Sequence, residues 1–189
     1  MTQPPVCLHF QEYVRFALGW VRMAEASRSR RAVQGIAALL LGSGLLGCDH
    51  ATKEAASALA NRPAHSLIAG VLELRYAENH DTAFSLLRGV DMPHKTTILL
   101  GLAAAATVLV ALVWLRRASR ASGWEHAGLA MMLAGAIGNV ADRVTRGFVI
   151  DFIHVDRWPI FNVADVAVVA GVIALGISAI RARRVTARA

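Results

Sequence analysis

The stretch FNVADVAVVAGVIALGISAI, residues 161–180, decides the class of fold. From Val163 to Ile180 it is apolar except for one ionisable residue, Asp165. A helix needs about 17–25 such residues to cross the hydrocarbon core of a bilayer. A carboxylate inside such a segment costs roughly 2.5–3.5 kcal/mol on insertion, so by default it marks a functional site. The stretch therefore predicts a membrane helix that carries a functional group near its start.

The composition of the whole chain also indicates a membrane protein. Of its 189 residues, 56% are hydrophobic and only 17% are charged, whereas soluble domains carry about 25% charged residues. One further apolar stretch, Ala127–Ala141, is short, but it can begin at Trp124 if Glu125 and His126 lie among lipid headgroups. We expect a mainly α membrane protein with four transmembrane helices, at about residues 32–48, 96–115, 124–141 and 163–180.

The net charge of +7 does not indicate a nucleic-acid-binding protein, because no basic face with interleaved aromatic residues is present. The arginines instead cluster beside the ends of the predicted spans, at residues 28–31, 116–120 and 181–184. Cytoplasmic loops of membrane proteins carry an excess of Lys and Arg. This bias predicts that both termini are cytoplasmic and that the candidate site faces the outer side of the membrane.

The predicted spans divide the chain into three parts. Residues 1–31 form a cytoplasmic extension, 32–184 the four-span domain and 185–189 a cytoplasmic tail. Within the extension, His9–Val21 has apolar residues at helical spacing, which fits either an interfacial amphipathic helix or an accessory segment without a role in the chemistry.

An element of about residues 50–94 lies between the first two spans, on the predicted outer face. Ala51–Asn61 is expected to form a short helix, and Ser66–Ile68 and Val71–Tyr76 are expected to form strands. The second segment alternates apolar and charged residues, as in a half-buried strand. These segments predict a small sheet of two or three strands. The sheet either holds an extended substrate along its edge or covers the site as a lid.

The segment Leu45-Leu46-Gly47-Cys48 follows an apolar run that has arginines before it. This order of features imitates a secretory signal that ends in a lipid-attachment cysteine. Such a chain would be cleaved before Cys48. The three further apolar stretches favour a permanent first span instead.

Polar residues recur at the predicted outer ends of the spans. Asn139 and Asp142 are three residues apart and share a helical face, and Asn162 and Asp165 repeat this spacing. Arg143 follows Asp142 directly and is expected to neutralise it. Asp151, in the loop before the last span, supplies a second carboxylate, and with Asp165 it forms a candidate acid/base dyad.

Five blocks of this sequence, in this order, resemble the signal peptidase II family. They are Asp49-His50-Ala51-Thr52-Lys53, Asn79-His80-Asp81-Thr82-Ala83-Phe84, Gly138-Asn139-Val140-Ala141-Asp142-Arg143, Val149-Ile150-Asp151-Phe152 and Phe161-Asn162-Val163-Ala164-Asp165. The resemblance covers about residues 31–184, and the last three blocks together are highly specific. The chain departs from the family at Asp81, where the usual residue is Gly, so we expect Asp81 and Thr82 to rebuild the turn with side-chain hydrogen bonds.

The resemblance implies an intramembrane aspartyl endopeptidase of the bacterial inner membrane. It would cut diacylglyceryl-modified prolipoproteins on the N-terminal side of the lipidated cysteine, with no cofactor or metal and as a monomer. Asp151 and Asp165 match the catalytic dyad. The matching positions that support the dyad or contact substrate are Asn79, Asn139, Asp142, Arg143 and Asn162, and those at the head of the first loop are Asp49 and Lys53.

Two other classes of function use the same residues. A metal-dependent hydrolase could use Asp142, Asp151, Asp165 and His154 as ligands, since carboxylates and imidazole suit hydrolytic metals. No compact His/Asp pair at i, i+4 spacing supports it. A small transporter could use Asp165 as a proton or cation site, but no convincing internal repeat is present.

Overall fold

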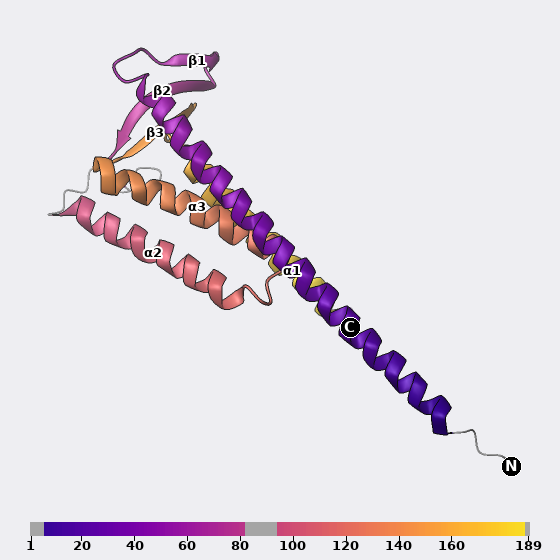
Figure 1. The fold of residues 1–189 in the computed structure, drawn as a ribbon. Helices are drawn as coiled ribbons and strands as arrows, with labels where there is room; N and C mark the ends of the chain where they lie inside the picture. The colour runs from indigo at the N-terminus through magenta and orange to yellow at the C-terminus, as the bar shows by residue number, and fades with distance from the viewer. Residues whose placement is uncertain (1–5, 82–93, 188–189) are drawn as a thin grey trace.

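The computed structural model describes residues 6–81 and 94–187 of the chain. Four helices carry most of these residues, and a small antiparallel sheet lies at one end of them (Figure 1). The helices are α1 (Val6–Ser57), α2 (Lys95–Arg117), α3 (Gly123–Arg146) and α4 (Val163–Thr186). The strands are β1 (His65–Ile68), β2 (Leu72–Asn79) and β3 (Val149–Val155).

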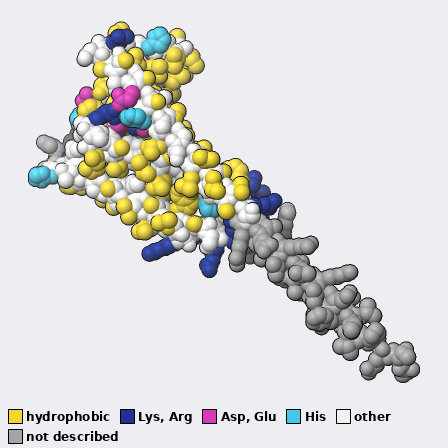
Figure 2. Space-filling model, in the orientation of Figure 1, with side chains coloured by type: hydrophobic (Ala, Val, Ile, Leu, Met, Phe, Trp, Pro, Cys, Tyr) yellow, Lys and Arg dark blue, Asp and Glu magenta, His cyan; other side chains and the backbone are white. Residues whose placement is uncertain are grey.

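Three of the helices are long and apolar enough to cross a membrane: Ser29–Ser57 within α1, Lys95–Arg117, and Val163–Arg184 within α4. Their outward side chains include many exposed aliphatic residues, such as Leu40, Leu102 and Ile173. Figure 2 shows hydrophobic side chains spread over the outer surface of the helices. This surface fits a hydrocarbon environment, so the mainly helical membrane fold is confirmed in its coarse form.

Helix α3, which contains the predicted third span, does not reach the apolarity of the other three. It lies at the centre of the arrangement and contacts α1, α2 and α4. Its buried residues are mostly small, including Gly128, Ala130 and Gly135. Because its neighbours cover it, α3 needs fewer apolar side chains than a lipid-facing helix does.

Helix α1 is continuous through residues expected to form two separate elements. The predicted break between the first span and the helix at Ala51–Asn61 is wrong, since α1 runs without interruption to Ser57. No proline occurs between Val6 and Arg62, and an ion pair between Asp49 and Lys53, four residues apart, lies inside the helix. At its other end α1 extends past the remaining helices (Figure 1) and includes His9–Val21, whose side chains lie outside the described part.

The sheet has the strand order β1-β2-β3, and both pairs are antiparallel. The two predicted strands are present, and β2 extends three residues further, to Asn79. The third strand was not predicted, because Asp151 was assigned to a loop. In fact β3 pairs with β2, so that Asp151 lies opposite Ala77. Sequence periodicity missed β3 because its first four residues, including Asp151, are all buried and no alternation marks them.

Close packing between α3 and α4 depends on glycines at their contact. A Cβ at Gly135 would collide with the Ala164 carbonyl and would meet Val168 Cγ2 at 2.8 Å. At Gly171 a Cβ would meet Met132 Cγ at 2.5 Å. Small residues at such contacts let membrane helices approach closely, and this approach brings the start of α4 against α3.

We expect Gly135→Ala to destabilise the protein by about 1–3 kcal/mol, because the added methyl group forces α3 and α4 apart. Gly101→Ala is the matched control, since a Cβ there meets nothing within 4 Å and alanine favours the helix. The measurement is thermal unfolding in detergent. Equal unfolding temperatures for the two variants would contradict this account of the α3–α4 contact.

Candidate active site

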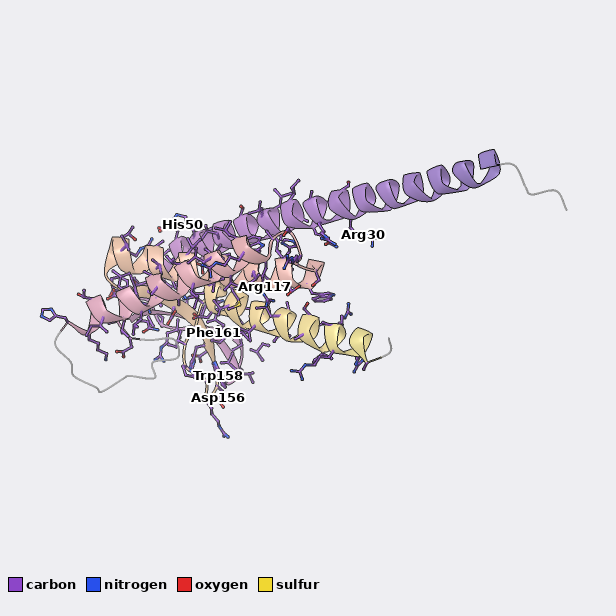
Figure 3. All side chains as sticks on the ribbon, turned by 90° about the horizontal axis from the view of Figure 1, so that it is seen from below. Arg30, His50, Arg117, Asp156, Trp158 and Phe161 are labelled. Carbon is purple, nitrogen blue, oxygen red and sulfur yellow. The ribbon has the colours of Figure 1, made fainter. Side chains whose placement is uncertain are left out.

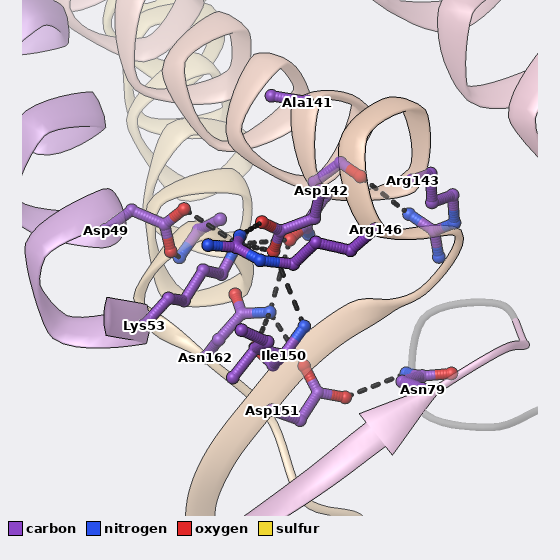
Figure 4. Close-up of polar contacts among 12 residues, drawn as sticks. Asp49, Lys53, Asn79, Ala141, Asp142, Arg143, Arg146, Ile150, Asp151 and Asn162 are labelled. Carbon is purple, nitrogen blue, oxygen red and sulfur yellow. Dashed lines mark hydrogen bonds and ion pairs between the residues drawn. The ribbon is translucent and has the colours of Figure 1, made fainter. Parts of the chain in front are cut away.

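The predicted site residues come together where the helices meet the sheet. Helix α1 brings Asp49 and Lys53, α3 brings Asn139 and Asp142, and other members come from the end of β2, from β3 and from the start of α4 (Figure 4). Most of these side chains are joined by hydrogen bonds or ion pairs. Residues more than 100 positions apart in the sequence thus form one polar cluster at the edge of an apolar helical bundle.

Asp151 lies near the start of β3 and is only 3% exposed. Its Oδ2 accepts a hydrogen bond from Asn79 Nδ2 at 2.8 Å, and its Oδ1 accepts one from Asn162 Nδ2 at 2.7 Å. Burial, and secondly the nearby charge of Asp165, raise the pKa of Asp151 from 3.8 to about 7. This carboxyl therefore keeps its proton to a higher pH than an exposed aspartic acid does.

Asp165 lies in the first turn of α4 and forms a reciprocal cap with Asn162. Asn162 Oδ1 accepts from the Asp165 N–H at 3.0 Å, and Asp165 Oδ2 accepts from the Asn162 N–H at 3.3 Å. This is the capping-box pattern with an aspartate in the third position. Asn139 Nδ2 donates to the other oxygen, Asp165 Oδ1, at 2.9 Å. Asn162 thus contacts both aspartates of the candidate dyad.

The backbone before Asp151 is held from two sides. The Ile150 N–H donates to Asp142 Oδ2 at 3.4 Å, and the Ile150 carbonyl accepts from Asn162 Nδ2 at 3.3 Å. Ile150 is 1% exposed and belongs to the apolar cluster beneath the sheet. Asp142 and Asn162 therefore fix the position of Asp151 through its neighbour.

A cavity of about 410 Å³ lies beside the two aspartates. Asp151, Asp165, Asn79, Asn139 and Arg143 line its polar part. The rest of its wall is apolar, from residues Leu99, Leu102, Ala103, Ala106, Ala136, Val149, Val168 and Val169. The cavity therefore offers ionisable groups at one end and a surface for hydrocarbon at the other.

Lys53 is 1% exposed and is surrounded by polar partners. Its Nζ lies 2.7 Å from Asp49 Oδ2 and 2.9 Å from Asp142 Oδ2, and it donates to Asn139 Oδ1 at 3.0 Å. Asp49 also accepts, through Oδ1, the N–H of Ala164 at 2.9 Å, in the first turn of α4, where a negative charge is favoured. Asp49 and Lys53 were expected at the head of a loop, but both lie within α1.

The expected neutralisation of Asp142 by Arg143 is wrong. Consecutive helical residues point in different directions, and Arg143 donates instead to the carbonyls of Asn139 at 3.2 Å and Asp81 at 2.8 Å. Asp142 pairs with Lys53 and with Arg146, one helical turn further on. Arg146, which also binds Glu54, was missed, although its i, i+4 spacing from Asp142 was a usable signal.

Asp81 lies just after β2 and does not adopt a glycine-like backbone. Among the described non-glycine residues, positive φ values occur at Asn61, His94 and Arg157. The Asp81 N–H donates to Asn79 Oδ1 at 2.9 Å. Its carboxylate pairs with Lys95 of α2. Asn79, rather than the expected Asp81 side chain, therefore stabilises the described part of this turn, and Thr82 lies outside the described residues.

The four residues considered as metal ligands do not converge. His154 Nδ1 lies 3.5 Å from Glu73 Oε2, further along β3, and Asp142 is occupied by Lys53, Arg146 and the Ile150 N–H. The described ranges contain no group of three or more His, Cys, Asp or Glu side chains arranged to hold a metal ion. The structure therefore does not support this ligand set.

Membrane-length helices around a cavity that Asp151 and Asp165 line are an arrangement typical of a membrane enzyme. Residues 41–181 match the model of the family Signal peptidase (SPase) II. Because the match covers more than half of the chain, the chain belongs to the signal peptidase II family. It is therefore an aspartic-type protease of the lipoprotein signal peptidases.

Individual relatives agree with this assignment. The lipoprotein signal peptidase of Streptococcus pneumoniae is 32% identical over 155 residues, which are 80% of this chain and 95% of that protein. The one from Syntrophomonas wolfei is 42% identical over 114 residues, 60% of this chain and 72% of that protein. A solved bacterial membrane enzyme, determined by the in meso method, shares the fold with a TM-score of 0.63 over 77% of this chain and 88% of its own, at 22% identity.

We expect Lys53→Met to destabilise the protein by about 3–5 kcal/mol, because it leaves Asp49 and Asp142 buried with less compensating charge. The triple variant Lys53→Met/Asp49→Asn/Asp142→Asn should recover part of this loss. Arg117→Met is the control, since Arg117 is 64% exposed in its ion pair with Glu125 and exposed pairs contribute about 0–1 kcal/mol. Unfolding in detergent measures all three, and equal losses for Lys53→Met and Arg117→Met would contradict the prediction.

The pKa of Asp151 predicts a pH-dependent effect of Asp151→Asn on stability. The folded protein binds this proton more tightly than the unfolded chain does, so the native protein loses stability as the pH rises from about 4 to about 7. The Asn variant lacks this loss. Its stability relative to the native protein should therefore increase over this range, by a few kcal/mol in order of magnitude. Unfolding at pH 5 and pH 8 tests this, and a constant difference would contradict it.

Proposed function

We propose that this protein removes signal peptides from diacylglyceryl-modified prolipoproteins by cutting on the N-terminal side of the lipidated cysteine, with Asp151 and Asp165 as the catalytic dyad. The observation that carries the proposal is that both carboxylates line one cavity while Asn162 hydrogen-bonds to each of them. Membership of the signal peptidase II family supports the substrate class.

The chemistry follows from two carboxyl groups that share one proton. The charge of Asp165 helps to raise the pKa of Asp151, so both do not readily ionise together near neutral pH. The ionised carboxylate takes a proton from a water molecule, whose oxygen attacks the scissile carbonyl carbon. The protonated carboxyl gives its proton to the carbonyl oxygen, which forms a tetrahedral intermediate. The C–N bond of this intermediate then breaks as the carboxyl that took the water proton passes it to the leaving amine, while the other carboxyl regains its proton from a hydroxyl of the intermediate. The pair titrates as a unit, so the two roles belong to the dyad.

The amides hold the dyad in position for this reaction. Asn79 and Asn162 each donate to Asp151, and Asn139 donates to Asp165. Asp142 and Lys53 act one step further away, through Ile150 and Asn139, while Asp49 fixes the start of α4. Arg143 lines the cavity and holds the Asp81 carbonyl, which places it where a substrate carbonyl or headgroup oxygen can be bound.

The apolar wall of the cavity fits the lipid part of the substrate. Leu102 on α2 and Val169 on α4 line the cavity and are also 63% and 46% exposed on the surface of the helices. Acyl chains can therefore lie against these residues without leaving the hydrocarbon phase. This arrangement lets a lipid-anchored peptide reach the dyad laterally from the bilayer.

The proposed topology has four spans, with α3 as the third, both termini in the cytoplasm and the dyad at the outer face. Helix α3 lies between three apolar helices, and this position supports α3 as a span. Arginines near the ends of the helices away from the sheet support the orientation, by the positive-inside bias. Described residues of a single chain line the cavity on the side of both aspartates, and we expect the protein to act as a monomer.

Asp151→Asn and Asp165→Asn should each abolish cleavage of a lipidated prolipoprotein, because the remaining carboxyl cannot be both acid and base. Asp156→Asn is the matched control: this carboxylate is exposed at the tip of the sheet, away from the helices (Figure 3). The assay is mass-spectrometric detection of the released signal peptide with purified protein in detergent. Substantial turnover by either dyad variant, with normal folding, would overturn the assignment.

Two further arms of that assay separate the alternatives. Excess chelator should leave cleavage unchanged, whereas a metal-dependent hydrolase would lose activity. The unlipidated substrate should not be cut if the apolar wall binds acyl chains. Equal cleavage of the lipidated and unlipidated substrates would contradict the proposed substrate class but not the dyad.

A further inference from the structure

A second cavity lies between α1, α2 and α3, near the ends of these helices away from the sheet. Its volume is about 210 Å³, and it is lined by Gly35, Leu39, Trp114, Leu115, Ala118 and His126. Leu39 and Leu115 are 59% and 75% exposed. Because both belong to membrane-length helices, the cavity opens toward the hydrocarbon of the bilayer.

His126 places an unused hydrogen-bond donor in this apolar cavity. The ring is 3% exposed, and its Nδ1 lies 2.9 Å from Trp114 Nε1. Indole nitrogen can only donate, so His126 Nδ1 accepts and the ring hydrogen lies on Nε2. Among the described residues, Nε2 is the buried side-chain nitrogen or oxygen without a hydrogen-bond partner. Leaving such a donor unsatisfied is unfavourable, and an acceptor on a ligand would remove this cost.

A separate basic pocket of about 550 Å³ lies toward the arginine-rich end of the bundle, and its Gln34 directly precedes Gly35 of the apolar cavity. Arg30, Arg31 and Arg120 line it together with Gln34 and the start of α3. Arg31 and Gly35 are one helical turn apart on the same face of α1, which spans about 6 Å. Arg31 Nη1 also donates to the Ser119 carbonyl at 2.7 Å, which ties α1 to the α2–α3 connection.

The arrangement is visible in two views. Figure 2 shows Lys and Arg side chains at the end of the described bundle that lies away from the sheet, directly beside hydrophobic side chains. Figure 3 shows Arg30 on α1, toward the end of the helical bundle that lies away from His50. Positive charge therefore meets an apolar, bilayer-facing surface at this point.

We infer that these two pockets form one binding site for an anionic phospholipid. The arginines bind the headgroup phosphate, His126 Nε2 donates to an ester carbonyl of the same lipid, and an acyl chain lies against Leu39 and Leu115. Basic pockets between membrane helices on the cytoplasmic side suit such headgroups. The site lies at the opposite end of the bundle from the dyad, so its lipid is distinct from the substrate.

Brominated lipids test the site through Trp114, which lines the cavity. The full-length protein with Trp20→Phe, Trp124→Phe and Trp158→Phe retains this one indole. It is reconstituted in phosphatidylcholine vesicles that contain increasing fractions of brominated phosphatidylglycerol or brominated phosphatidylcholine. Cleavage of the lipidated substrate serves as the folding check. We expect half-maximal quenching at about a tenfold lower fraction of the anionic lipid.

Two pairs of arginine variants separate a specific site from general surface charge. Arg30→Gln/Arg120→Gln should abolish the preference for phosphatidylglycerol, whereas Arg116→Gln/Arg184→Gln removes the same charge elsewhere and should retain it. His126→Phe should weaken quenching several-fold, and His126→Gln, which keeps a donor, should weaken it less. Equal quenching by both lipids, or equal loss in both arginine pairs, would overturn the proposal.

Discussion

The ammonium group of Lys53 is the interaction on which the rest of the site depends. An isolated buried ammonium is strongly unfavourable, and here two carboxylates and an amide oxygen surround it. Each of these partners makes a second bond to another element. Asp49 binds the start of α4, Asp142 binds the backbone of β3, and Asn139 binds Asp165. One side chain on α1 thus connects the helix and the strand that carry the two aspartates of the candidate dyad.

Two aspartates nine residues apart show how environment separates their roles. Asp142 forms ion pairs with Lys53 and Arg146 and does not line the cavity. Asp151 is equally buried but receives only amide donors, and burial raises its pKa to about 7. Cationic partners stabilise the charged form of a carboxylate, whereas burial without them favours the protonated form. The same residue type therefore forms ion pairs in one place, and in the other it has a raised pKa that suits the proposed proton transfer.

The sequence predicted the parts of this structure that depend on local chemistry. Apolar run length located three of the helices, and the Asn-x-x-Asp spacing placed Asn162 and Asp165 on one turn. It could not predict β3, since the four buried residues at the start of this strand show no alternation. Nor did it identify Arg146 as the partner of Asp142, because Arg143 is adjacent in the sequence, whereas only Arg146 shares a helical face with Asp142. The continuity of α1 through Asp49 and Lys53 was missed because charged residues at the end of an apolar run resemble the start of a loop, whereas their ion pair stabilises the helix.

The close packing of the helices and the polar cluster depend on each other. A buried network of ions and amides in an apolar bundle is stable only when its members are satisfied together. These hydrogen bonds and ion pairs form only if the start of α4 lies within hydrogen-bonding distance of both α1 and α3. A side chain larger than hydrogen at Gly135 or Gly138 would prevent this close approach. At Gly138 a Cβ would lie 2.5 Å from Asp49 Oδ2, so the same glycine admits the carboxylate that binds Lys53. The glycines of α3 therefore determine where charge can be buried, and the buried charge in turn determines where Asp151 and Asp165 lie.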